Sequence, residues 1–305
     1  SAVNKIVVGD SNNDGNVDIS FTGGDIQPVQ SVDYLTGDVI WSVDHDDRGA
    51  NFLSIADGDS DGNNEVYFGA GSSNEAHFYV YDLATLEQEF RNVHTDPGYI
   101  GVKIADIDKD GVEEIVALVS RTNSRRHYGI LYVFNSETRE LEWQSPAEYF
   151  GNPFQVDFSS LKVADIDGDG AVEVLIGGLY TFRRGHIIVV DGETKTIKNE
   201  VEIELDLWNN TYWLLDNIDD DAQLEIISGF VEVVSFGKYD LTVQVVDGKT
   251  FDIQHTQTIE INTNGFLASA NVRNLQIEDF NDDGSKEIVF EINTHPLEDA
   301  DKFFI

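Results

Sequence analysis

Six short acidic segments recur along the chain, and their residue types are suited to binding a metal ion. They read DSNNDGNVD from Asp10, DGDSDGNNE from Asp57, DIDKDGVEE from Asp106, DIDGDGAVE from Asp165, NIDDDAQLE from Asn217 and DFNDDGSKE from Asp279. The shared form is D-x-[DN]-x-D-G-x-x-[DE], and successive segments start 47, 49, 59, 52 and 62 residues apart. A pattern that recurs at this period predicts one equivalent metal loop in each structural repeat.

The ligand types in these segments favour calcium. Side chains at positions 1, 3 and 5 can converge, position 7 can offer a backbone carbonyl, and position 9 adds a carboxylate. Glycine at position 6 permits the positive φ of a tight loop. An all-oxygen ligand set suits a hard divalent cation, and without His or Cys zinc and copper are disfavoured. The predicted ligands are Asp10, Asn12, Asp14, Asn16, Asp18; Asp57, Asp59, Asp61, Asn63, Glu65; Asp106, Asp108, Asp110, Val112, Glu114; Asp165, Asp167, Asp169, Ala171, Glu173; Asn217, Asp219, Asp221, Gln223, Glu225; and Asp279, Asn281, Asp283, Ser285, Glu287.

Two other interpretations of the acidic segments are open to test. An EF-hand requires Glu at position 12, where this chain has Phe21, Phe68, Ala117, Ile176, Ser228 and Phe290. Plain acidic turns are the second alternative, since Asp, Asn and Gly are ordinary turn residues. Three or four carboxylates directed at one point would then repel one another. In the fifth segment Asn217 and Ala222 replace the first Asp and the Gly, so we expect that loop to bind poorly or to be empty.

A second repeat lies between the acidic segments. It has the form Asx-x-x-Thr and starts at Asp33, Asp82, Asn135, Asp191 and Asp247, each time after a strand-like run. The Asx side chain can bond forward along its own backbone and begin a tight turn. Five residues after the Thr, three copies place Trp41, Phe90 and Trp143, which we interpret as core between sheets.

Together the two repeats predict a four-stranded unit. Strand one leads into the metal loop, strand two leaves it, strand three ends at the Asx-x-x-Thr turn, and strand four follows. About six such units of roughly 50 residues predict an all-β fold, a β-propeller of six blades, forming one domain over residues 1–305. Residues 302–305 read as a third strand, so the last blade is expected to be incomplete, with seven blades in a longer protein as the alternative.

The acidic segment with its flanking strands resembles the FG-GAP or VCBS-type repeat, and DIDGDGAVE from Asp165 shows the likeness best. The resemblance covers essentially the whole chain. It implies the calcium-bearing propeller of integrin α-subunits and of secreted bacterial proteins, with calcium between the first two strands of each blade. That fold carries adhesion proteins, lectins and polysaccharide lyases alike, so the resemblance does not imply one activity.

Composition excludes several partners. There are 57 Asp and Glu against 19 Lys and Arg, a formal net charge of −38, which argues against nucleic acid and anionic membranes. With no Cys the chain has neither disulfides nor thiol chemistry. No apolar run approaches the roughly 20 residues of a membrane span. The chain also lacks Met, from which we expect a processed or excised piece of a protein.

Two windows on the loops that join strands two and three concentrate cations and aromatic rings. They hold five of the nine arginines, in neighbouring repeats. Arginine recognises carboxylates through paired hydrogen bonds, and aromatic rings can stack on sugars. We expect an anionic ligand there, an acidic glycan or an acidic peptide, although simple surface ion pairing is the alternative. The residues are Arg121, Arg125, Arg126, His127, Tyr180, Phe182, Arg183, Arg184 and His186.

These observations predict an extracellular, calcium-stabilised recognition or adhesion module. Millimolar calcium outside cells fills weak sites that would be empty in the cytosol. With absent cysteine and strong acidity, this favours a secreted or cell-surface protein of a bacterium or archaeon, with about five to six structural calcium ions. Its partner would be a glycan or a protein, or a chain docking at the incomplete blade. No catalytic residue is assigned, and a polysaccharide lyase is the alternative function.

Overall fold

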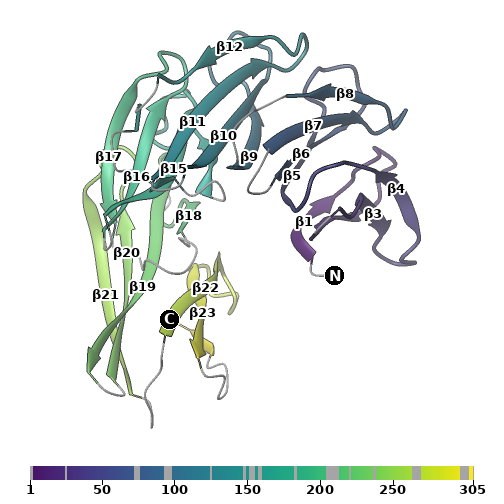
Figure 1. Ribbon diagram of the computed structural model, residues 1–305. Coiled ribbons are helices and arrows are strands. Elements are labelled where there is room, and N and C mark those ends of the chain that lie inside the picture. The colour runs from purple at the N-terminus through teal and green to yellow at the C-terminus, as the bar shows by residue number, and fades with distance from the viewer. Residues whose placement is uncertain are drawn as a thin grey trace. The chain divides into compact units, whose positions relative to one another are not determined.

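The chain folds into antiparallel β-sheets, as the repeats predict. The computed structural model describes residues 3–24, 26–71, 76–92, 98–123, 126–146, 149–150, 155–156, 160–181, 184–203, 213–219, 221–235, 238–262, 269–295 and 302–304. In these ranges 24 strands form six sheets, and no α-helix is present. Successive strands lie beside one another, as β9 to β12 show (Figure 1). Without a helix in the described ranges, no helical membrane span is found there.

The chain divides into two compact units, Ser1–Val163 and Ala164–Ile305. The first unit contains three four-stranded sheets with strand orders β1-β2-β3-β4, β5-β6-β7-β8 and β9-β10-β11-β12. Their strands are β1 (Val3–Gly9), β2 (Asp18–Gly23), β3 (Val29–Asp33), β4 (Val39–Val43); β5 (Ala50–Ala56), β6 (Glu65–Gly71), β7 (Ala76–Asp82), β8 (Gln88–Arg91); β9 (Gly98–Ala105), β10 (Glu114–Asn123), β11 (Arg126–Asn135) and β12 (Leu141–Gln144).

The fourth sheet contains the boundary between the units, which falls inside its strand β14. Five strands contribute to this sheet, and the fifth and sixth sheets have four and three. Their strands are β13 (Gln155–Val156), β14 (Lys162–Ala164), β15 (Glu173–Thr181), β16 (Arg184–Asp191), β17 (Ile197–Ile203); β18 (Trp213–Asp216), β19 (Glu225–Ser235), β20 (Lys238–Val246), β21 (Ile253–Asn262); β22 (Ser269–Glu278), β23 (Glu287–His295) and β24 (Lys302–Phe304). In the described ranges the last sheet therefore has three strands, in agreement with the predicted incomplete blade.

Each sheet is built as the sequence repeats predict. β1 ends at Gly9 and β2 begins at Asp18, so the first acidic segment is the connection between them. The same connection recurs between the first two strands of four other sheets, and between β14 and β15 in the fourth sheet. The Asx-x-x-Thr turns follow β3, β7, β11, β16 and β20, and in all five the Asx Oδ1 accepts from the Thr backbone N–H at 2.5 to 2.8 Å.

The core lies between neighbouring sheets, which pack face to face within each unit. One apolar cluster joins Phe52, Tyr67 and Phe78 of the second sheet to Ile115 and Tyr132 of the third. Equivalent clusters join the first sheet to the second, the fourth to the fifth and the fifth to the sixth. Trp41 is 3% exposed in one of these clusters and Phe90 packs against another, which confirms the core prediction for these two. Trp143 is half-buried, and its ring contacts Tyr149 instead. Four-stranded sheets stacked in this way are the blades of a β-propeller.

Candidate metal centres

One backbone contact is the same in all six acidic loops. The carboxylate at position 9 begins the second strand and accepts a hydrogen bond from the backbone N–H of position 2. The pairs, with N···O distances, are Ser11–Asp18 (3.0 Å), Gly58–Glu65 (2.9 Å), Ile107–Glu114 (2.8 Å), Ile166–Glu173 (3.1 Å), Ile218–Glu225 (2.8 Å) and Phe280–Glu287 (2.9 Å). The first five of these carboxylate residues are at most 1% exposed. Five loops are thus closed at the base by a buried acid, and the sixth by the half-buried Glu287.

The upper part of the loop is shaped by its other acids. In the five loops that begin with Asp, this position-1 residue accepts from the N–H of the position-6 Gly at 2.8 to 3.1 Å. In all six, the position-5 Asp accepts from the N–H of position 7 at 2.7 to 2.9 Å. The glycines at position 6 have φ between 82° and 95°, the left-handed backbone that glycine adopts without strain. The predicted role of this glycine is confirmed.

Position 4 is also left-handed, which sequence reasoning missed. Asn13, Ser60, Lys109 and Asp282 have φ of 59° to 63°, and Gly168 has φ of 71°. No single residue type marks the position, so the sequence carried little signal. Two left-handed residues at positions 4 and 6 wrap the loop tightly, which explains how acids four and eight residues apart reach one point.

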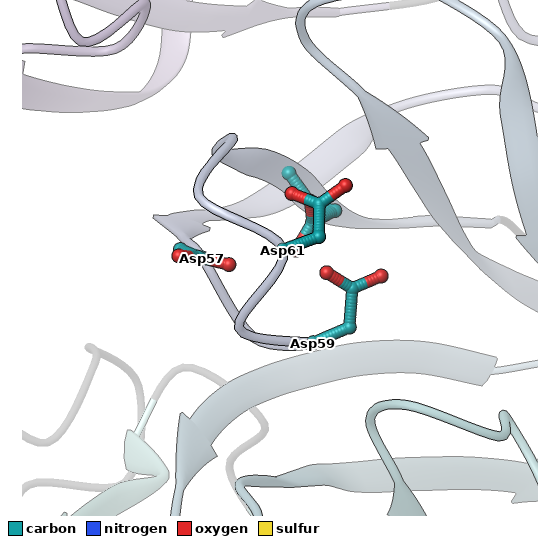
Figure 2. A group of neighbouring side chains, drawn as sticks. Asp57, Asp59 and Asp61 are labelled. Atoms are coloured by element: carbon teal, nitrogen blue, oxygen red, sulfur yellow. The ribbon is translucent and has the colours of Figure 1, made fainter.

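The structure brings the predicted acids of five loops together. In each, at least three acids contribute one oxygen to a set whose members lie within 4.8 Å of one another. Figure 2 shows Asp57, Asp59 and Asp61 on the turn between β5 and β6. Asp110 and Asp169 lie outside these sets, and Asn12 of the first loop instead donates to Asp14 Oδ2 at 3.1 Å. The sets are Asp57, Asp59, Asp61, Glu65; Asp106, Asp108, Glu114; Asp165, Asp167, Glu173; Asp219, Asp221, Glu225; and Asp279, Asp283, Glu287.

Several oxygens in these loops are buried without a hydrogen-bond donor among the residues that the structure describes. Glu65 Oε1, Glu225 Oε1 and Asp18 Oδ1 are such atoms, on side chains that are 0% exposed. The outer oxygens Asp57 Oδ1 and Asp59 Oδ1 share this condition. A buried carboxylate oxygen without a donor is costly, and a cation would satisfy it. The donor set therefore fits an oxygen-loving divalent ion.

Electrostatics lead to the same conclusion for Glu65. Burial, helped by the neighbouring charge of Asp59 and opposed by the hydrogen bond from Gly58, raises the pKa of Glu65 to about 7. Burial likewise raises the pKa of Glu225, with Asp219 and Asp221 adding to the shift. These carboxylates are thus hard to ionise in the folded chain without a compensating positive charge.

The fifth loop has a different internal structure, as its substitutions led us to expect. Asn217 has one amide oxygen where the other loops have a carboxylate, and its side-chain amide donates to the backbone carbonyl of Asp221. Ala222 is not among the described residues with positive φ, so the loop is reshaped rather than strained. Asp219, Asp221 and Glu225 nonetheless converge. Reduced metal binding at this loop stays a prediction.

Two cationic side chains at the loops were not found from the sequence. Lys198 Nζ lies 2.7 Å from both Asp167 Oδ2 and Glu173 Oε1 in the fourth loop. Arg139 Nη2 lies 3.2 Å from Asp59 Oδ2 in the second loop and also contacts Glu89 Oε2. Each comes from another segment of its unit, Lys198 from β17 and Arg139 from the turn after β11, so local spacing gave no signal. These two ion pairs partly neutralise the carboxylates of the second and fourth loops.

The predicted ligand-face residues fall at the ends of two hairpins. Arg121, Arg126 and His127 lie where β10 and β11 meet, with Thr122 paired to His127. Tyr180 and Arg184 lie where β15 and β16 meet. Arg125, Phe182 and Arg183 fall outside the described residues, and so do the side chains of the other five. His186 is described, and its Nδ1 lies 2.8 Å from Glu200 Oε1 on β17.

Comparison with known proteins shows the fold. No protein-family model and no curated protein sequence matched the chain. Among solved structures it is similar to Saccharomyces cerevisiae Sqt1, with TM-score 0.57 and 11% identity over 94% of this chain and 68% of that one. It is also similar to the Dos1 propeller, with TM-score 0.56 and 11% identity over 100% and 69%, and to the AfRom2 CNH domain, with TM-score 0.52 and 13% identity over 98% and 79%. At these identities the similarity concerns the fold alone, and that fold is a multi-bladed β-propeller.

Proposed function

We propose that this chain is an extracellular β-propeller of the FG-GAP or VCBS type, stabilised by calcium and acting as a recognition or adhesion module. The observation that carries the proposal is the convergence of three or four acids in five loops, four of which are closed by a buried carboxylate. The orphaned buried oxygens of Glu65 and Glu225 add a second reason. In a turn that bound no ion, these buried carboxylate oxygens would only lower the stability of the fold.

The residues suited to hold the ion are the acids at positions 1, 3, 5 and 9. A bound calcium ion would supply positive charge and accept lone pairs from oxygens that lack donors. In the second loop, Asp57 and Asp59 follow β5 and Glu65 begins β6, so a shared cation would tie the two strands together. Because Glu65 is buried, ionising it is unfavourable until that charge is neutralised.

Recognition is proposed for the hairpin ends, away from the metal loops. The metal loop of the third sheet follows β9 and precedes β10, whereas the arginine-rich hairpin lies at the other end of β10. A glycan or protein ligand with carboxylates would suit guanidinium groups there. The chain's net charge of −38 is unfavourable to such a ligand elsewhere on its surface.

Thermal unfolding with and without calcium tests the structural role. We expect EDTA to lower the melting temperature, and restored millimolar calcium to recover it better than sodium at equal ionic strength. Each ion held at 100 times its dissociation constant adds about 2.7 kcal/mol to the free energy of unfolding. An unchanged melting temperature after complete chelation would show that the loops are not structural calcium sites.

A glycan array in calcium buffer, rich in uronate and sialate ligands, tests the recognition role. Binding lost in an Arg126→Ala variant and kept in an Arg48→Ala variant would support the hairpin as an acidic-glycan site. Retained binding in Arg126→Ala would remove that hairpin from the proposal. A blank array would direct the search to a protein partner, and release of unsaturated uronate products would indicate the lyase instead.

A further inference from the structure

The first two acidic loops are joined by two asparagine side chains. Asn64, at position 8 of the second loop, directs its side-chain amide at the first loop. Its Nδ2 lies 3.1 Å from the Asp10 carbonyl oxygen, 3.3 Å from the Ser11 carbonyl oxygen and 2.9 Å from Asn13 Oδ1. In return, Asn13 Nδ2 donates to the Gly62 carbonyl oxygen at 3.2 Å. These two loops are therefore bonded directly to each other.

The same kind of contact recurs between other neighbouring loops of each unit. The position-2 carbonyl of the second loop, Gly58 O, accepts a hydrogen bond from Ser136 Oγ of the third sheet. The equivalent carbonyl of the fourth loop, Ile166 O, accepts from the backbone N–H of Leu224, position 8 of the fifth loop, at 3.0 Å. Lys286, position 8 of the sixth loop, donates to the position-1 carbonyl of the fifth loop at 2.9 Å. Contact between neighbouring loops is thus a property of the repeat.

The contact of Asn64 lies on a short path between the two acids that close the loops at their bases. The Ser11 N–H donates to Asp18 Oδ2 at 3.0 Å, and the Ser11 carbonyl accepts from Asn64. Asn64 directly precedes Glu65, which is 0% exposed and whose Oε1 has no donor among the described residues. The backbone that holds the base acid of one loop is therefore held by the residue beside the base acid of the other.

The two loops differ in how well their acids are already arranged. In the second loop Asp57, Asp59, Asp61 and Glu65 form a set of oxygens within 4.8 Å of one another. Among the described residues, the acids of the first loop form no such set. We therefore expect the second loop to bind an ion first and the first loop to need rearrangement. When one ligand has already ordered a segment, a second ligand that needs the same order binds more tightly.

We propose that the Asn13–Asn64 pair couples the first two acidic loops, so that the first loop binds calcium more tightly once the second loop is filled. The inference rests on the proposed calcium function and adds to it the dependence of one site on another. A direct electrostatic effect acts in the opposite direction, because filling one acidic loop weakens the negative potential at the next. Salt screens that effect, since the Debye length is only about 3 Å at about 1 M, whereas the amide contacts persist.

Calcium titration of the full chain in about 1 M sodium chloride, followed by NMR of isotope-labelled glycine amides, tests the coupling. Gly15 and Gly62, at position 6, report on the first and second loops, because their N–H groups donate to Asp10 and Asp57. Glu65→Gln removes a ligand from the second loop. If the loops are coupled, the calcium midpoint at Gly15 should then rise by at least about five-fold.

The same comparison in an Asn64→Ala background isolates the contact. There, Glu65→Gln should leave the midpoint at Gly15 unchanged within about two-fold. In a Gln257→Ala background, which removes an exposed amide on β21 of the second unit, the rise of about five-fold should remain. Asn13→Gly removes the partner amide and suits the φ of 59° at this position, so it serves where Asn64→Ala fails to fold.

Coupling is reciprocal, so Asp10→Asn in the first loop should also raise the midpoint at Gly62. A calcium response at Gly62, with a midpoint at Gly15 that Glu65→Gln does not change, would overturn the coupling and leave the calcium function standing. A rise at Gly15 that persists in both Asn64→Ala and Asn13→Gly would overturn its assignment to the asparagine pair. No calcium response at either glycine would overturn the calcium function and the coupling together.

Discussion

Glu65 shows how one side chain connects the sequence pattern to stability. One oxygen accepts hydrogen bonds from the Gly58 N–H at 2.9 Å and the Tyr67 hydroxyl at 3.0 Å. The other oxygen, Oε1, is buried without a donor among the described residues. The fold therefore satisfies one of the two carboxylate oxygens, and a bound cation would satisfy the other. Its effect on stability should reverse when calcium is added.

The substitution Glu65→Gln tests this reversal. Without calcium, the variant should be as stable as the unmodified chain or more so, because a buried charge is removed. With millimolar calcium it should gain less stability, by up to about 2.7 kcal/mol, since the second loop loses one ligand. Denaturant unfolding in EDTA measures the stability without calcium, and unfolding in calcium measures the stability gained. The exposed Glu137→Gln is the control, and an equal calcium response in the two variants would contradict the prediction.

Lys198 gives a prediction of the opposite sign. Its ammonium group already satisfies Asp167 and Glu173 at 2.7 Å, so a metal ion at the fourth loop must displace it. Lys198→Gln should raise the calcium affinity of that loop and destabilise the calcium-free chain by about 1–3 kcal/mol, because Glu173 is left buried and unpaired. Calcium titration by calorimetry measures the affinity. Lys249→Gln, in an exposed turn, is the control, and unchanged calcium binding in Lys198→Gln would refute the argument.

At the scale of single residues, the sequence predicts the contacts that form within one loop. Positions 1, 5, 6 and 9 of each loop act within nine residues, and their hydrogen bonds recur as the spacing suggested. The contacts of Lys198 and Arg139 with the loops were not predicted, because both side chains come from other segments of the fold. The sequence around a lysine on a strand does not indicate which carboxylate its ammonium group will contact.

Among the elements, the Asx-x-x-Thr turns are the most regular feature. Asp247 Oδ1 accepts from the Lys249 N–H at 2.9 Å and the Thr250 N–H at 2.6 Å. The hydrogen bond from Thr250 holds the pKa of Asp247 below its usual value of 3.8. Ionised Asp247 therefore stabilises the turn above the unfolded-state pKa, and this contribution is lost as the pH falls through the lower folded-state pKa.

Asp247→Ala should accordingly destabilise the chain by about 1 kcal/mol at neutral pH. The difference from the unmodified chain should shrink as the pH falls below about 3.8. Chemical denaturation at several pH values checks both expectations. Asp252→Ala removes the same charge from an exposed position in the same turn. The proposed role of the turn fails if both variants lose equal stability.

Gly248, the next residue, shows what the turn sequence leaves undetermined. Its φ is not positive, so the backbone alone does not demand glycine. A Cβ there would lie 2.1 Å from the Leu224 carbonyl oxygen and 2.4 Å from that of Ile166. These are backbone atoms of neighbouring blades in the same unit. Equivalent turns carry Tyr34, Leu83 and Ser136 at this place, so the constraint comes from packing and not from the turn.

Gly248→Ala should therefore be strongly destabilising, by about 1–3 kcal/mol or more, because the backbones must separate. Thermal unfolding compared with Gly9→Ala measures the effect. Gly9 has no atom within 4 Å of the equivalent position and no positive φ, so this control should stay within about 1 kcal/mol. A similar small loss in both variants would show that the second unit accommodates the methyl group.

For the whole molecule, the repeat period predicted the six sheets and their strand order. The division at Val163 was not anticipated, because neither composition nor motif changes there. What the sequence does specify is where charge gathers. The 57 acids outnumber the basic residues three to one, and the acidic loops concentrate carboxylates at one equivalent strand connection in every sheet. Their mutual repulsion opposes folding unless ions reduce it.

Monovalent salt should therefore stabilise the calcium-free chain. Raising sodium chloride from about 0.1 M to about 1 M shortens the Debye length from about 10 Å to about 3 Å, which screens repulsion between loops and within them. The melting temperature in EDTA should rise along this series. The rise should be smaller in calcium, because bound ions would already neutralise the carboxylates that repel most. A melting temperature that falls with salt in EDTA would mean that attractive ion pairs such as Lys198 with Glu173 outweigh the net negative charge.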